Sequence, residues 1–158
     1  MFSFCNNENL KIISDNQPHI EARAVLPSCN KEEIKDIKKF PFISTKNTNF
    51  FITDKTDNEE YRILIPKGFK TDLASIPFGF RWLFGGKSNP HFIVAAIVHD
   101  KLCNDKYLIK YNRELSTLIF KELLLSSGYN KNKADVMAWA VNNYQKFFNN
   151  YWRLICYL

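Results

Sequence analysis

The side chains best suited to chemistry in this sequence lie between Pro66 and Cys103. A histidine and an aspartate, His99 and Asp100, are adjacent in the run AAIVHDKLC, and a second aspartate, Asp72, lies in the run TDLASIP. A histidine can act as a general base near neutral pH, while carboxylates orient such a base or bind a metal ion. These residue types make His99 and Asp72 candidate catalytic residues and Asp100 a candidate metal ligand.

Two hydroxyl side chains flank Asp72. Ser75 is a candidate nucleophile that His99 would activate, because a serine needs only a nearby base, but no Gly-x-Ser-x-Gly elbow surrounds it. Thr71, the other hydroxyl in this stretch, is a candidate binding residue. Asp72 and Ser75 are also spaced as in a turn or cap, where a carboxylate accepts backbone N–H groups. Cys103, one turn after His99, is either a thiol partner or a small buried apolar side chain.

The same residues fit a structural hypothesis as well. Successive positions on an α-helix point about 100° apart, so His99 and Asp100 cannot both face one point. Buried polar side chains cost free energy unless they find hydrogen-bond partners. Asp72, His99 and Asp100 could therefore form a buried polar cluster that connects β structure with helices, and the sequence leaves this alternative open.

The elements that must position these residues begin with strands. Four β-rich runs predict them: LKII (10–13), IEARAVLP (20–27), NFFITD (49–54) and EEYRILIP (59–66). The last two runs are separated by four turn-forming residues and predict a hairpin. Tyr61, Ile63 and Ile65 would share one face of its second strand.

Helices follow. Asn30 and Glu33 have the spacing of a capping box, which predicts a short helix over 31–39. Three more helices are predicted after a proline or a capping residue, at 90–103, 113–127 and 131–148. In the last, Val136, Trp139 and Tyr144 would lie on one side with Ala140, and the tail 151–158 would form an edge strand or a final turn. The predicted fold class is α+β, with a small N-terminal antiparallel sheet or hairpin packed on a C-terminal bundle of about three helices.

Length and composition limit the protein classes. A chain of 158 residues fits one domain, and a net charge of +6 is scattered along it, most densely in KEEIKDIKK with alternating signs. The sequence therefore offers no clear nucleic-acid site. Its four cysteines form no C-x-x-C pair, and we expect neither a signal peptide nor a transmembrane segment. Reduced thiols in a cytoplasmic protein are the expectation.

Two motifs in order resemble a known family. PKGFKTDLASIP (66–77) and AAIVHD (95–100) are similar to the strand-end and helix motifs of domain-of-unknown-function family 1353 of phages and prophages. The resemblance covers about residues 42–152, which leaves 1–41 as a variable N-terminal part of the single domain 1–158. In the family's second helix the pattern is Arg-x-x-Ala-Asp-x-x-Phe. Arg113 and Phe120 match it, which makes Arg113 a candidate binding residue, but Thr117 stands where the family has aspartate.

A looser, motif-level similarity links the His-Asp helix to phospholipase A2 enzymes. It implies His99 as general base and Asp100 as calcium ligand, with Thr117 in place of the acid that would orient the histidine. Calcium or zinc is implied only if this hydrolase interpretation holds. The cofactor is otherwise unknown.

Three functional hypotheses remain open. The first is a phage or prophage accessory or virion-associated protein that uses the Asp/His/Asp cluster structurally and binds other phage proteins or a host protein. The second is a metal-assisted hydrolase, phospholipase-like or directed at the cell envelope, with His99 as general base. The third is a host-protein binder that uses the aromatic residues near the C-terminus.

Overall fold

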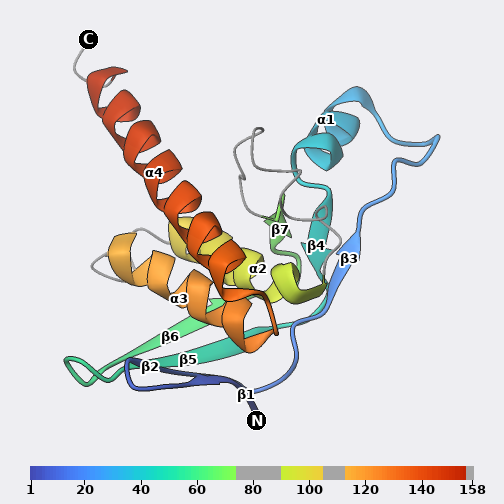
Figure 1. Cartoon of the computed structure of the whole chain (residues 1–158). Coiled ribbons are helices and arrows are strands. Elements are labelled where there is room, and N and C mark those ends of the chain that lie inside the picture. The colour runs from blue at the N-terminus through green and yellow to red at the C-terminus, as the bar shows by residue number, and fades with distance from the viewer. Residues whose placement is uncertain (74–89, 105–112, 156–158) are drawn as a thin grey trace.

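The computed structural model describes residues 1–73, 90–104 and 113–155, leaving aside the side chains of 90–91 and 144–155. These ranges contain two antiparallel sheets and four helices (Figure 1), and the α+β prediction is confirmed. The strands are β1 (Phe2–Asn6), β2 (Leu10–Ser14), β3 (Ile20–Ala22), β4 (Phe42–Ser44), β5 (Thr48–Asp54), β6 (Glu59–Ile65) and β7 (Lys70–Thr71). The helices are α1 (Lys31–Lys39), α2 (Pro90–Asn104), α3 (Arg113–Ser126) and α4 (Lys131–Ile155).

The larger sheet has the strand order β1-β2-β5-β6 and contains the predicted hairpin. β5 and β6 pair from Thr48 with Ile65 to Asp54 with Glu59. Asn58 in the connecting turn has φ 60°, a conformation that asparagine tolerates better than most residues. The prediction of a strand over 20–27 was too long, because β3 ends at Ala22 and Cys29 N–H donates to Leu26 O in a turn.

The smaller sheet, β3-β4-β7, continues the larger one around a bend. Along the chain β3 follows β2, β4 precedes β5, and β7 follows β6. The strand order β3-β4-β7 of the smaller sheet therefore repeats the order β2-β5-β6 of the larger one. Asn16 Nδ2 donates to the Asn47 carbonyl at 2.9 Å within this bend. Gly68 has φ +86°, which favours glycine, and its N–H donates to Ser44 O at 2.8 Å. The bend carries the end of β7 away from the larger sheet.

The core lies between the larger sheet and the helices that cover one of its faces (Figure 1). α2 is the central helix, as its sequence predicted, and its residues 95–98 are fully buried. α2 packs on β6 and α3, and α3 also packs on β1. The largest side chains of this core with under 2% exposure include Phe50, Phe92, Phe120, Ile52, Ile65 and Leu123.

Local signals set the helix ends. Asn30 and Glu33 form the predicted capping box at α1. After α3, Gly128 has φ +82°, and the N–H groups of Gly128 and Tyr129 donate to the carbonyls of Leu125 and Leu124, the pattern of a Schellman motif. Both ends were predicted from sequence.

In α4 the side that carries Val136 and Trp139 is an exposed one. Val136 and Trp139 are 39% and 61% exposed, and the buried side of the helix is formed by Ala134, Met137 and Val141 instead. Packing against α3 selects small and flexible side chains for this contact, so the largest aromatic side chain is not the buried one. Of the two alternatives predicted for the tail, an edge strand or a final turn, the edge strand is wrong, because residues 151–155 continue α4; residues 156–158 lie outside the described ranges.

Candidate functional site

The site is built around Thr71 at the end of β7. The Thr71 side chain is 2% exposed, and its hydroxyl donates a hydrogen bond to Oδ2 of Asp100 on α2. The same hydroxyl oxygen accepts the N–H of Leu73 at 2.9 Å. A hydrogen bond to an ionised carboxylate is stronger than one between neutral groups. One side chain thus connects the smaller sheet, the turn after β7 and the central helix.

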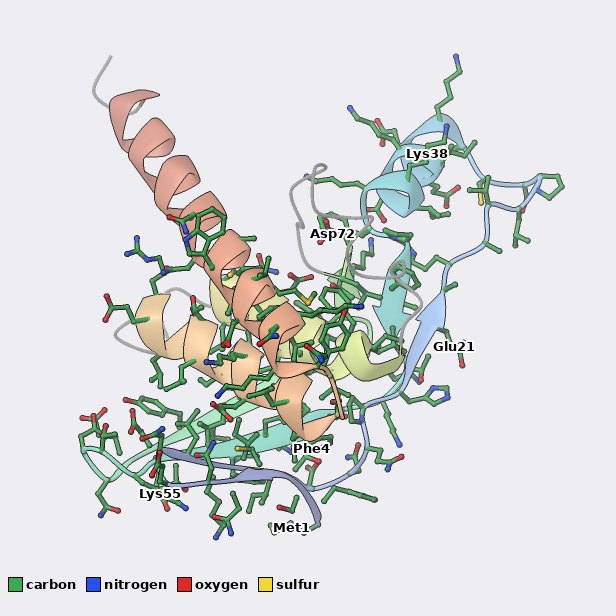
Figure 2. All side chains as sticks on the ribbon, in the orientation of Figure 1. Met1, Phe4, Glu21, Lys38, Lys55 and Asp72 are labelled. Atoms are coloured by element: carbon green, nitrogen blue, oxygen red, sulfur yellow. The ribbon has the colours of Figure 1, made fainter. Side chains whose placement is uncertain are left out.

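The turn after Thr71 is held in an unusual backbone conformation. Leu73 has φ 57° and a fully buried side chain. The left-handed region costs an L-residue with a Cβ about 1–2 kcal/mol. Burying a leucine side chain contributes about 1.5–3 kcal/mol, so packing offsets the strain. The turn places Asp72, which is half-buried, beside the end of β7 (Figure 2).

His99 and Asp100 face different elements, as their helical spacing predicted. Asp100 bonds Thr71 of the smaller sheet, whereas the His99 ring lies 5.3 Å from the Phe120 ring of α3. His99 is 5% exposed, and burial lowers its pKa to about 4. The imidazole is therefore neutral at neutral pH, and its burial makes it a weaker base than an exposed histidine.

Cys103 contacts His99 through the face of the ring. Its Sγ lies 3.8 Å from Nδ1 and 3.7 Å from Nε2 of His99. The two nitrogens point in different directions in the ring plane, so an atom aligned with one lies much farther from the other. If the sulfur lay in the ring plane midway between the two nitrogens, it would overlap with Cε1, the carbon atom that joins them. The nearly equal distances therefore place the sulfur above the face of the ring. This is a sulfur–aromatic packing contact rather than an aligned Cys–His pair.

The second-helix residues have structural partners. The Thr117 hydroxyl, at the position of the family's aspartate, donates to the Arg113 carbonyl at 2.9 Å, and Ser116 Oγ donates to the same carbonyl at 2.9 Å. Arg113 is half-buried, and its Nε has no hydrogen-bond partner among the residues that the structure describes. Ser75 lies outside the described ranges. The catalytic, binding and metal roles predicted for these residues stay predictions.

Sequence reasoning missed the pairing of Thr71 with Asp100 and the role of Leu73. A threonine two residues before a buried N–H is a recognised turn signal, so the contact with Leu73 was detectable. The bond to Asp100 joins residues 29 positions apart, and no local pattern indicates it.

Among the described residues, no three His, Cys, Asp or Glu side chains gather closely enough to hold a metal ion. The helices of this part of the chain include none that is long and apolar enough to cross a bilayer.

The fold and site define an α+β protein in which helix α2, which carries His99 and Asp100, is hydrogen-bonded to the smaller sheet through Thr71. The chain matches the family described as "Protein of unknown function (DUF1353)" over residues 49–141, more than half its length. The chain belongs to that family, and the resemblance seen in its motifs is confirmed. No curated protein and no solved structure matches the chain. The matched segment contains Thr71, His99 and Asp100, whereas α1 precedes it.

Proposed function

We propose that this chain is an accessory or virion-associated protein of a phage or prophage, and that its motif residues hold the fold together rather than carry out a reaction. The similarity of TDLASIP and AAIVHD to phage and prophage sequences supports the origin. The hydrogen bond from Thr71 to Asp100 supports the structural role. Its partners would be other phage proteins or a host protein.

The burial of His99 and the hydrogen bond of Asp100 support this proposal further. Asp100 directs one carboxylate oxygen to Thr71, and His99 is 5% exposed beside Phe120. A general base must come within hydrogen-bond reach of the proton that it abstracts. A buried ring that packs on a phenylalanine and a thiol is better suited to filling the junction of α2 and α3.

Replacing His99 by alanine tests the structural role. Removing a large buried side chain costs about 2–4 kcal/mol. At about 2–4 °C per kcal/mol for a chain of this size, the melting temperature should fall by about 10 °C. Asn104→Ala, an exposed position on the same helix, is the control and should leave it unchanged. A His99→Ala variant whose melting temperature equals that of the wild type would contradict the structural role.

The virion association has a separate test. Particles induced from the strain that carries the gene are purified on a density gradient, and their proteins are identified by mass spectrometry. The chain should appear in the particle fraction. Its presence only in the unassembled fraction would leave an accessory role inside the cell and reject the virion-associated one.

A metal-assisted hydrolase is the second candidate, and the adjacent positions of His99 and Asp100 in the run AAIVHD favour it. Burial lowers the pKa of His99 to about 4, so the ring would need a charged partner in the site to act as a base near neutral pH. Asp100 would supply a carboxylate oxygen to calcium or zinc beside it. Calorimetric titration with each metal, on the wild type and on Asp100→Asn, tests this candidate. Heat of binding that Asp100→Asn abolishes would favour it, and no heat in either protein would remove the metal version.

A further inference from the structure

The most distinctive surface outside the family segment is the arm, which we define as residues 23–39: the loop 23–30 and helix α1. Figure 1 shows α1 beyond the smaller sheet, away from the larger one. Arg23 and α1 are tied together, because Arg23 Nη1 donates to the Phe40 carbonyl at 3.0 Å and Ile37 is buried. The arm is therefore an ordered surface with a fixed outer side.

Four lysines gather on one side of α1. In the sequence of α1, lysines and acidic residues are mixed. Successive residues of a helix are about 100° apart, however, and this spacing places Lys31, Lys35, Lys38 and Lys39 within an arc of about 100°. All four are exposed, and Figure 2 labels Lys38 on the arm. None of them forms an ion pair with another described residue; Lys39 Nζ lies 5.1 Å from the ring centroid of Phe40.

Two of the three acids of α1 are used within the arm and its anchor. Asp36 Oδ2 pairs with Arg23 Nη2 at 2.8 Å and with Lys70 Nζ at 2.6 Å. These two hydrogen bonds hold the pKa of Asp36 below its ordinary value, with that from Lys70 the larger cause. Glu33 accepts the N–H of Asn30 at 2.7 Å in the capping box. The third acid, Glu32, is exposed and lies about 20° beyond the Lys39 end of the lysine arc. The arc itself therefore carries four positive charges, with one negative charge at its edge.

The loop before α1 adds exposed aliphatic side chains. Val25 and Leu26 are 49% and 57% exposed, and Pro27 follows them. A single exposed aliphatic residue needs no explanation, but these two are consecutive in the loop that leads into α1. Aliphatic side chains next to lysines are the composition of segments that bind the interface of an anionic bilayer.

We propose that the arm docks on a bilayer surface that carries anionic phospholipids, with Val25 and Leu26 entering the headgroup region and the lysines of α1 lying over it. Protein interfaces are enriched in aromatic residues and arginine and depleted of lysine, which disfavours a protein partner for this surface. Nucleic-acid surfaces use arginine for base edges and aromatic rings for stacking, and the outer side of the arm offers neither. This inference does not depend on the proposed function.

The expected affinity is modest and sensitive to salt. Each lysine near an anionic surface strengthens binding by about fivefold, and ions screen this attraction within about 8–10 Å at physiological salt. Replacing two lysines should therefore weaken partition by at least about 25-fold. The matched control is Lys131→Glu/Lys133→Glu, which makes the same change of net charge at exposed positions on α4, outside the arm.

Vesicle co-sedimentation tests the proposal. The probes are phosphatidylcholine vesicles with and without phosphatidylglycerol, at low and physiological salt. The wild type and the Lys131→Glu/Lys133→Glu control should bind only the anionic vesicles. Lys35→Glu/Lys38→Glu should lose binding, and Val25→Ser/Leu26→Ser, which leaves the charge unchanged, should weaken it. Circular dichroism verifies that each variant is folded, and Lys35→Gln/Lys38→Gln replaces the reversal variant if that one is not.

Three outcomes would overturn the proposal. The first is no binding of the wild type to anionic vesicles at low salt. The second is equal loss in the α4 control, which would assign binding to net charge alone. The third is binding to polyglutamate that depends on Lys35 and Lys38 without any binding to vesicles, which would assign the surface to an acidic protein.

Discussion

Replacing Thr71 with valine removes the hydroxyl that joins β7 to α2 while it keeps the side-chain volume. The bond to the Asp100 carboxylate is of the kind that contributes about 1.5–3 kcal/mol, and leaving the buried N–H of Leu73 without this acceptor costs about 1 kcal/mol more. We therefore expect Thr71→Val to lower the free energy of unfolding by about 3 kcal/mol. At about 2–4 °C per kcal/mol, the melting temperature should fall by about 10 °C.

Thr71→Ser is the matched control, because it keeps the hydroxyl and removes only a methyl group. It should cost about 1 kcal/mol. Urea unfolding followed by circular dichroism and fluorescence measures both variants and verifies that the transition is two-state. A cycle with Asp100→Asn should give a coupling energy of about 1–3 kcal/mol. If Thr71→Val is as stable as Thr71→Ser, the hydroxyl does not connect the sheet to the helix and the reasoning fails.

Two further predictions concern His99 and α1. The pKa of His99 in the folded protein, about 4, lies below the ordinary value of 6.5, so folding disfavours the protonated ring. The contribution of the neutral, buried ring to stability is therefore complete above pH 6.5 and declines as the pH falls toward 4. The loss should reach about 3 kcal/mol by urea unfolding, and His99→Leu should lack this part of the pH dependence; an unchanged profile would show that the ring is not buried. Asn30→Ala removes the cap of α1 and should cost that helix about 1 kcal/mol, seen as faster amide exchange in residues 31–34 but not in α3; equal rates would mean that the cap is dispensable.

Sequence reasoning succeeded where the determining interactions are local. The capping box of α1 and the glycine end of α3 each depend on residues a few positions apart, and both were predicted. It failed where packing between elements decides. The side that α4 buries is set by its packing against α3, and the periodicity of α4 alone does not decide it: Met137 is 1% exposed and Trp139 is 61% exposed. The contact of Thr71 with Asp100 depends on the bend between the two sheets, which no single segment encodes.

The two residues of β7 connect the arm and the helical body separately. Successive side chains of a strand point to opposite faces. Lys70 is exposed and pairs with Asp36 of α1, whereas Thr71 is buried and bonds Asp100 of α2. β7 lies within the residues that match the family, and through Lys70 it binds the arm, which lies outside those residues.

This arrangement predicts separable effects. Lys70→Met removes one of the two cations that hold Asp36 and should speed amide exchange in α1 while leaving exchange in α2 unchanged. Thr71→Val should speed exchange in α2 and change α1 less. Hydrogen exchange followed by mass spectrometry of peptides from each helix measures both, with Lys133→Met as a control for the loss of a lysine. If each variant accelerates both helices equally, β7 transmits strain between its two faces and the arm is not attached independently of the core.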